Sequence, residues 1–190
     1  AVVLDDDIDI KAVATQLATS ANSYAGQSCC SAQRIYIHQK IYEDFSKIFL
    51  EEVRKLPAGD PNRPETIIGP VIDEDSAKRI ETWIDQALGS GAECLLGGPR
   101  VGTFIPPHIL ANVPASSEIC TEEIFGPVVL IQSVPTFEEG LRQAQTTRYG
   151  LRSSAYTNKM NSLFEAQKAL RAGGVMINLP PTYRVDSAPF

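Results

Sequence analysis

Two short segments of this sequence carry residues that could do chemistry, and the first centres on a cysteine. Gly26-Gln27-Ser28-Cys29-Cys30 lies between a helix-like and a strand-like segment. A cysteine thiol is only a few per cent ionised at neutral pH, yet it is intrinsically very nucleophilic. The nearby glycine permits close approach of a substrate, and backbone N–H groups in such a turn would stabilise a developing oxyanion. The segment therefore suits attack by one thiol on a carbonyl group.

The residue types alone also allow an inert role for the cysteine pair. Adjacent cysteines do not readily bridge each other, because a trans peptide holds their Cα atoms closer than disulfide geometry prefers. Their spacing is not the C-x-x-C of zinc or redox sites, and free cysteine is among the most buried residue types. One nucleophile with a bystander, or two inert core thiols, therefore both stay open, and cysteine statistics alone favour burial.

The second segment is Glu122-Glu123-Ile124-Phe125-Gly126-Pro127, just before an apolar run. Side chains two residues apart point the same way in extended backbone, so Glu123 and Phe125 could act together, although the segment alone favours a structural role. The carboxylate would hold a ribose hydroxyl, and the aromatic side chain would pack against a flat ring. The alternative is a strand-entry turn with a solvated acid and a core phenylalanine.

Helical and strand-like segments alternate along the chain. We expect strands at 1–4, 34–38, 93–96, 104–110, 128–134, 153–157 and 174–178, and helices at 8–23, 41–56, 74–88, 137–146 and 161–171. Asp5-Asp6-Asp7 is interpreted as the cap and first turn of the first helix, and Gly26 as its stop. Pro106 and Pro107 predict that 104–110 is an edge strand. The alternation predicts one α/β domain with a mostly parallel sheet flanked by helices.

The composition is that of an ordinary globular protein and excludes several kinds of partner. Of the 190 residues, 43% are hydrophobic and 21% charged, which suffices for a core without disulfides or a metal. The net charge of −6 argues against nucleic acid, and no apolar run is long enough for a membrane helix. The four scattered or adjacent cysteines indicate a reducing compartment, taken to be the cytoplasm. Both ends look cut, so we expect a piece of a longer protein.

Together, the two segments resemble the active-site motifs of one enzyme superfamily. Gly26-Gln27-Ser28-Cys29, with Arg34 five residues after the cysteine, resembles the G-Q-x-C signature of the NAD(P)-dependent aldehyde dehydrogenases. Glu123-Ile124-Phe125-Gly126-Pro127 resembles their E-x-F-G-P motif at the expected distance downstream. Further landmarks of the superfamily occur in the right order at Gly69-Pro70, Tyr149-Gly150-Leu151, Asn178 and Pro189-Phe190.

The resemblance implies a role for each matched position. Cys29 matches the catalytic nucleophile, which attacks the aldehyde to give a thiohemiacetal; hydride then leaves for the nicotinamide, and water hydrolyses the resulting thioester. The backbone N–H of Cys29 would form half of the oxyanion hole. Glu123 matches the acid that binds the nicotinamide ribose, and Phe125 the aromatic that packs against the nicotinamide. Cys30 matches a variable position, and Asn178 a structural landmark at a strand end.

The resemblance also implies parts that lie outside this sequence. In the superfamily the general-base glutamate of an E-L-G-G-like motif, the oxyanion-hole asparagine and the cofactor domain come upstream, and an oligomerisation strand follows. We therefore expect residues 1–190 to be a catalytic domain, with NAD or NADP bound mainly by the missing domain. The substrate would be a small-molecule aldehyde, and the full-length protein a homodimer or homotetramer. We expect the fragment alone to be inactive as a dehydrogenase.

The substrate class depends on a single residue of this sequence. Arg184 lies in residues 182–186, where the superfamily builds part of its substrate tunnel. Its planar guanidinium suits a carboxylate or phosphate on the aldehyde. The alternative is a surface arginine paired with Asp186.

Other functions remain open from the residues. Cys29 would also serve a hydrolase or thioesterase that uses His38 or His108 as its base, or a CoA-acylating aldehyde dehydrogenase. A non-catalytic relative that keeps the fold is a further alternative, and the joint presence of Cys29, Glu123 and Phe125 argues against it.

Overall fold

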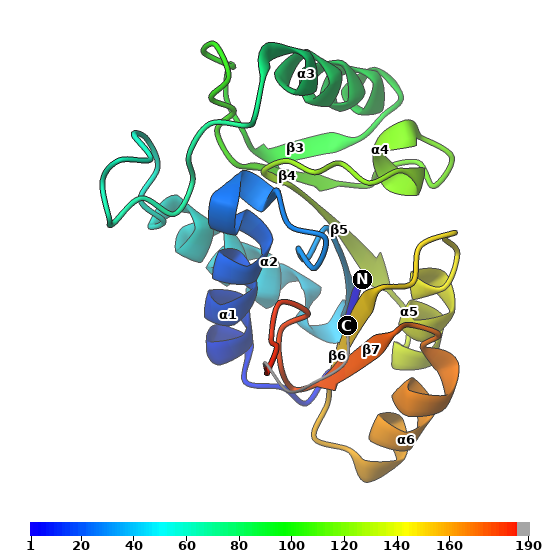
Figure 1. Cartoon of the computed structure of the whole chain (residues 1–190). Helices are drawn as coiled ribbons and strands as arrows, with labels where there is room; N and C mark the ends of the chain where they lie inside the picture. Colours follow the sequence, from blue (N-terminus) through cyan, green and yellow to red (C-terminus); the bar gives the residue numbers. More distant parts are fainter. Residues whose placement is uncertain (186–190) are drawn as a thin grey trace.

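The computed structural model describes residues 1–185, in which a seven-stranded sheet lies between two sets of helices (Figure 1). The strands are β1 (Val2–Leu4), β2 (Arg34–His38), β3 (Glu93–Leu96), β4 (His108–Ala111), β5 (Val128–Val134), β6 (Arg152–Tyr156) and β7 (Gly174–Ile177). The α-helices are α1 (Ile10–Asn22), α2 (Tyr42–Arg54), α3 (Glu74–Gly89), α4 (Glu118–Thr121), α5 (Phe137–Ala144) and α6 (Met160–Ala169). Short 3-10 turns occupy Ser23–Gly26 and Gln39–Ile41.

The strands follow the order β3-β4-β5-β2-β1-β6-β7, and every neighbouring pair is parallel except β3 with β4. Parallel neighbours need crossover connections, and the helices between successive strands supply them. The predicted α/β class, with a mostly parallel sheet flanked by helices, is therefore confirmed.

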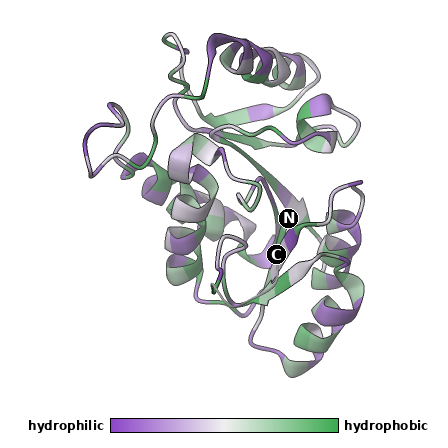
Figure 2. Cartoon of the chain, in the orientation of Figure 1, coloured by the Kyte–Doolittle hydropathy of each residue, from purple (hydrophilic) through white to green (hydrophobic). Residues whose placement is uncertain are grey.

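Successive side chains of each strand point to opposite faces of the sheet, and each face has its own helices. On one face Ile35 and Ile131 pack with α1 and α2. On the other face Tyr36 packs with α5 and α6, and Leu130 packs with α3. Figure 2 shows apolar residues on the strands and on the helix sides that face them, as expected for parallel strands covered on both faces.

The first helix starts later than the acidic run predicted. Its cap is Asp9, whose carboxylate accepts a hydrogen bond from the Ala12 amide at 3.0 Å. Asp5 and Asp6 instead accept hydrogen bonds from the Lys159 ammonium just before α6. The acidic run thus joins the end of β1 to the start of α6, and its assignment as a helix cap was wrong.

β4 is not the edge strand that the two prolines suggested. It begins at His108, after Pro106 and Pro107, so neither proline has to donate to a ladder hydrogen bond. β4 pairs with β3 on one side and β5 on the other, and the edges of the described sheet are β3 and β7.

The short helix α4 was not predicted, while the other predicted elements occur with ends shifted by up to a few residues. Within residues 1–185, no helix combines the length and hydrophobicity needed to cross a membrane.

Candidate active site

A tight turn between α1 and β2 carries Cys29. α1 ends at Asn22, and Tyr24, Ala25 and Gly26 then adopt left-handed φ angles of 54°, 57° and 68°. Two of these residues are not glycine, so the turn holds backbone in an uncommon conformation. The expectation that Gly26 ends the helix was wrong in detail, since the helix ends earlier and Gly26 closes the turn that follows.

Gly26 also joins the two motifs found in the sequence. A Cβ atom placed on Gly26 would overlap the carbonyl group of Gly126. Both glycines are buried, so the backbone of the cysteine turn lies directly against the backbone of the E-I-F-G-P segment. A side chain at Gly26 would push the two segments apart, in addition to being strained by the left-handed φ angle.

Strand pairing brings both motifs to one edge of the sheet. β2 starts at Arg34 and β5 at Val128, which places each strand five residues after Cys29 and Glu123 respectively. The two strands are parallel neighbours, with Arg34 opposite Leu130. Both motifs therefore enter the sheet side by side at the amino ends of the strands. Open α/β sheets more commonly bind ligands at the carboxyl ends.

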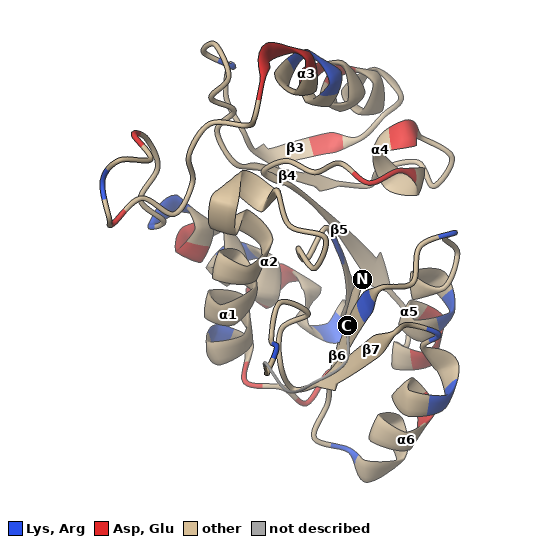
Figure 3. Cartoon of the chain, in the orientation of Figure 1, with Lys and Arg blue, Asp and Glu red and all other residues tan. Residues whose placement is uncertain are grey.

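Cys29 and Glu123 line the same cleft, which has a volume of about 240 Å³. The remaining wall comes largely from the loop between α5 and β6. Three arginines also line it, namely Arg34, Arg152 and Arg171, and Figure 3 shows basic residues on β2 and β6 in this region. Their positive charge would favour an anionic ligand at the mouth of the cleft.

The two adjacent thiols differ in exposure, and their surroundings raise the pKa of Cys30. Cys29 is exposed and Cys30 is half-buried, with their sulfur atoms 3.9 Å apart. Burial raises the pKa of Cys30, the Cys29 thiol raises it further, and the charges of Arg152 and Arg184 act in the opposite direction. Because the thiolate is the reactive form, these differences favour Cys29 as the nucleophile. The alternative of two buried core thiols does not fit the exposure of Cys29.

Glu123 and Phe125 project to either side of Ile124, whose side chain is fully buried. Phe125 has a left-handed φ of 51°, so the expectation of an extended segment was wrong, and the core position for this ring was wrong too, since it is 40% exposed. Phe125 lies outside the residues that line the Cys29 cleft. Among the described residues, the exposed Glu123 carboxylate forms no hydrogen bond or ion pair.

The neighbouring Glu122 is committed to protein contacts that the sequence did not reveal. Its carboxylate accepts a hydrogen bond from the Tyr149 hydroxyl at 2.9 Å and forms an ion pair with Arg148. These partners belong to the loop that contains the Tyr149-Gly150-Leu151 landmark, which was the one signal in the sequence. Of the two adjacent glutamates, Glu123 is thus the one left to meet a ligand.

Neither histidine lies in the cleft. His38 ends β2, at the opposite end of that strand from the cysteine turn, and its Nδ1 accepts a hydrogen bond from the Lys40 amide at 3.2 Å. His108 is buried, its Nδ1 lies 2.7 Å from the Pro106 carbonyl oxygen, and burial lowers its pKa. Within residues 1–185, the geometry provides no histidine base for Cys29.

The remaining predicted residues lie near the end of the described chain. Arg184 is exposed and does not line the cleft, yet its charge acts on the Cys30 thiol. Asp186 and Pro189-Phe190 lie outside the described residues. The Asn178 side chain accepts a hydrogen bond from the Thr157 amide at 2.9 Å and donates one to the Thr157 carbonyl at 3.0 Å. Asn178 therefore fastens the end of β7 to the end of β6, as a structural landmark would.

A sequence model of the aldehyde dehydrogenase family matches residues 1–190. This chain belongs to the aldehyde dehydrogenase family. A curated relative, the 3-sulfolactaldehyde dehydrogenase of Priestia aryabhattai, is 35% identical over 190 residues, which cover 100% of this chain and 40% of that dehydrogenase.

Solved aldehyde dehydrogenase structures share the fold. Aldehyde dehydrogenase 21 from Physcomitrella patens, in complex with the reaction product succinate, has a TM-score of 0.93 and 37% identity, over 100% of this chain and 40% of that one. The glyceraldehyde-3-phosphate dehydrogenase GapN of Methanocaldococcus jannaschii, complexed with NADP, has a TM-score of 0.95 and 32% identity, over 100% of this chain and 41% of that one. The chain therefore spans about 40% of the length of these aldehyde dehydrogenases.

Proposed function

We propose that this chain is the cysteine-bearing catalytic domain of a longer NAD(P)-dependent aldehyde dehydrogenase, which oxidises an aldehyde to a carboxylate. The observation that carries the proposal is the shared cleft of Cys29 and Glu123, in a chain that matches the family over its whole length. The share of the relatives that it spans supports a domain of a larger enzyme. The four free thiols support a reducing, cytoplasmic setting, and family resemblance supports a homodimer or homotetramer.

Cys29 would carry the covalent chemistry. Its thiolate attacks the aldehyde carbon, a C–S bond forms, and the carbonyl oxygen becomes an oxyanion that the backbone N–H of Cys29 stabilises. When bound, a nicotinamide supplies the acceptor for the hydride that leaves this carbon. The thioester left on Cys29 then takes up water, which releases the carboxylate and the thiol. The exposure of Cys29 and the raised pKa of Cys30 support this assignment.

Glu123 and Phe125 fit a nicotinamide nucleotide at this edge of the sheet. An exposed carboxylate without a protein partner suits the hydroxyl donors of a ribose. An exposed aromatic side chain beside it suits a flat ring. Glu123 would thus hold the ribose and Phe125 would limit where the ring can lie, next to Cys29.

An aldehyde that carries an anionic group is the proposed substrate class. Arg184 lies close enough for its charge to influence Cys30, and Arg152 adds a second positive charge. The named relatives are a 3-sulfolactaldehyde dehydrogenase, a structure with succinate and a glyceraldehyde-3-phosphate dehydrogenase. Each of these names refers to a molecule with a sulfonate, carboxylate or phosphate.

The test replaces each cysteine in turn in the complete enzyme. Cys29→Ala should lower kcat for aldehyde-dependent formation of the reduced nicotinamide by about 1000-fold or more, because the covalent step is lost. The matched control, Cys30→Ala, should stay within about threefold of the wild type. A Cys29→Ala enzyme that keeps its activity would refute the nucleophile. A loss of activity in His38→Gln would favour the hydrolase alternative instead.

A further inference from the structure

Gln33 lies between the cysteine turn and β2, and its two ends are held by different parts of the fold. Its backbone carbonyl accepts a hydrogen bond from the Leu130 amide of β5 at 2.9 Å. Its side-chain Nε2 donates to the Glu122 carbonyl at 2.9 Å, and its Oε1 accepts from the Ile124 amide at 3.2 Å. One side-chain amide thus pairs with a backbone donor and a backbone acceptor of the same segment.

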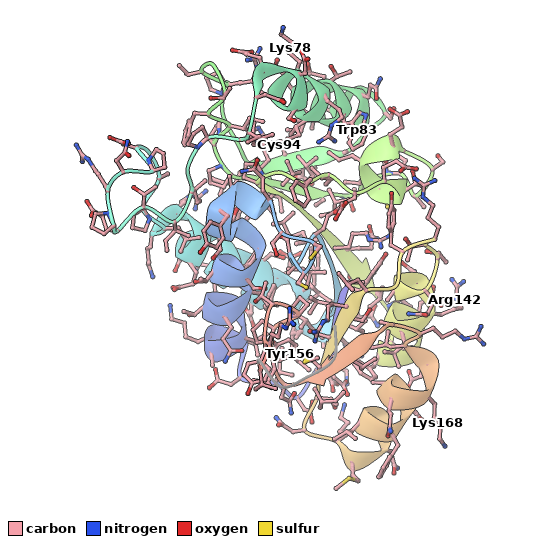
Figure 4. All side chains as sticks on the ribbon, in the orientation of Figure 1. Lys78, Trp83, Cys94, Arg142, Tyr156 and Lys168 are labelled. Atoms are coloured by element: carbon pink, nitrogen blue, oxygen red, sulfur yellow. The ribbon has the colours of Figure 1, made fainter. Side chains whose placement is uncertain are left out.

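The segment that Gln33 holds is restrained at the amide, the carbonyl and the side chain of Ile124. Arg79 of α3 donates from Nη2 to the Ile124 carbonyl at 2.8 Å. The guanidinium of Arg79 lies 4.5 Å from the ring centroid of Trp83, which Figure 4 labels on the same helix. The Ile124 side chain is fully buried, whereas Glu123 and Phe125 on either side of it are exposed. The protein therefore fixes the middle residue and leaves its two neighbours to project outward.

Backbone restraint is what orients these two projecting side chains. The Glu123 carboxylate forms no hydrogen bond or ion pair within residues 1–185. Phe125 adopts a left-handed φ of 51°, which is rare for an aromatic residue and persists only where the surroundings enforce it. A binding group that is held in its bound geometry beforehand loses less freedom when the ligand arrives. The contacts at Ile124 would supply this preorganisation.

Glutamines on both sides of Cys29 hold separate segments against the cysteine turn. Gln27 accepts a hydrogen bond from the Ile72 amide at 2.8 Å and donates to the Pro70 carbonyl at 3.3 Å. Gln33 does the equivalent for residues 122–124. The nucleophile is thus bracketed by two side-chain amides, and the second connects it to Glu123.

We propose that Gln33 is a positioning residue that sets how Glu123 and Phe125 meet the nicotinamide nucleotide, and so couples cofactor binding to the Cys29 turn. This inference rests on the proposed dehydrogenase function. It requires an amide at position 33, because the segment presents one carbonyl and one N–H. A carboxylate would keep the contact with the Ile124 amide but would face the Glu122 carbonyl without a proton to donate.

The experiment measures cofactor binding and catalysis separately in the complete enzyme. Gln33→Leu should weaken binding of the reduced nicotinamide cofactor, followed by fluorescence titration, by about tenfold, the equivalent of one to two lost hydrogen bonds. The KM for the aldehyde should change by less than about twofold, because both side-chain hydrogen bonds of Gln33 are made with the segment that carries Glu123. The matched control is Gln16→Leu on α1, since Gln16 also accepts one side-chain hydrogen bond, from Tyr156 at 3.3 Å; it should leave both quantities unchanged.

If the Gln33→Leu variant does not fold, the Gln33→Glu variant tests the same inference. The cofactor affinity of this variant is compared with that of the wild type at each pH. The difference should shrink as the pH falls, because the protonated glutamic acid at position 33 can again donate a hydrogen bond to the Glu122 carbonyl. Cofactor affinity that is unchanged in a folded Gln33 variant would overturn the inference and leave the proposed function intact. Equal losses in cofactor affinity and aldehyde KM would also overturn it, because they would indicate a general structural role. A wild-type enzyme that binds no nicotinamide cofactor would overturn the proposed function, and this inference with it.

Discussion

Three residues around the Cys29 cleft, Tyr24, Ala25 and Phe125, adopt left-handed φ angles without being glycine. Such conformations cost free energy and persist where surrounding contacts enforce them. Here the two motifs contact each other through the close, buried approach of Gly26 to the Gly126 backbone. At the residue scale, the turn that exposes the thiol and the segment that carries the ligand groups therefore stabilise one another.

Arg184 gives a prediction about substrate charge. In the complete enzyme, Arg184→Ala should raise KM for an aldehyde with a carboxylate or sulfonate by about tenfold or more, because a hydrogen bond to a charged group is lost. KM for a neutral aldehyde of similar size should be unchanged, as measured by initial-rate kinetics on the matched pair. The control is Arg63→Ala in the exposed loop before α3. Equal increases for both aldehydes would remove Arg184 from substrate recognition.

The motif residues could be singled out from the sequence, but the contacts that hold them could not. Cys29 and Glu123 stood out because each lies in a short motif that resembles the aldehyde dehydrogenase family, and the roles that the resemblance implies for them stay predictions. Gln33 and Arg79 escaped notice because their partners lie 91 and 45 residues away, and no local pattern reports such contacts. The left-handed φ of Phe125 is likewise set by distant contacts, which is why the expected extended geometry was wrong.

At the scale of the secondary-structure elements, the strands β2 and β5 bring the two motifs together, although the motifs lie far apart in the sequence. β2 and β5 each start five residues after a motif residue and pair in parallel, so the equal offsets place Cys29 and Glu123 at the same edge. β5 was predictable from its continuous apolar run, and β2 from the alternation of Ile35 and Ile37 with Tyr36. The pairing order was not, because a parallel sheet fixes its order through crossover helices rather than through adjacent residues.

The acidic run after β1 shows why helix starts are less predictable. Asp9, not the preceding aspartates, caps α1. The side chain of Asp5 is only 3% exposed and accepts a hydrogen bond from Lys159 at 2.9 Å, a partner that precedes α6 and is distant in sequence. The carboxylates of Asp5 and Asp6 suit either a local helix cap or a long-range ion pair, and in the structure they form the ion pair with Lys159.

Lys159 therefore gives a prediction about stability and its pH dependence. Burial by itself would raise the pKa of Asp5, but hydrogen bonds from Lys159 and its neighbours outweigh it and lower the pKa; Lys159 and Lys40 lower that of Asp6. A carboxyl group whose pKa is lower in the folded than in the unfolded chain stabilises the fold at pH values above its unfolded pKa of about 4. This contribution is lost progressively as the pH falls below that unfolded pKa. Lys159→Met should therefore cost about 2 kcal/mol at neutral pH, with a smaller cost in acid.

Urea unfolding of this 190-residue chain at neutral pH and at about pH 3 measures both effects. The control is Lys40→Met, which removes a more exposed partner of Asp6 and should cost less than about 1 kcal/mol. The interpretation would be refuted if the two lysine variants lost equal stability, or if the Lys159→Met deficit were the same at both pH values.

At the scale of the whole molecule, several side chains at and beside the cleft are exposed at the protein surface. Phe125 and Tyr149 are each about two-fifths exposed beside it, and the Glu123 carboxylate has no protein partner within residues 1–185. The chain spans about 40% of the length of its relatives. These features fit a catalytic domain that contributes one wall of an active site, and a longer enzyme would supply the other wall.

The last prediction follows from this division of the active site. The isolated 190-residue chain should form no reduced nicotinamide from an aldehyde and NAD or NADP, because under the proposed function the general base and most of the cofactor site belong to the rest of a longer enzyme, of which this chain would be about 40%. Its thiol should still react, so iodoacetamide should alkylate Cys29 faster than the half-buried Cys30, as peptide mass spectrometry would show. The complete enzyme serves as the positive control for turnover. Steady turnover by the chain alone would contradict the prediction, because the base and the cofactor site would then lie within these 190 residues. Alkylation of Cys29 without turnover would agree with it, because the thiol would be accessible while the groups needed for oxidation were missing.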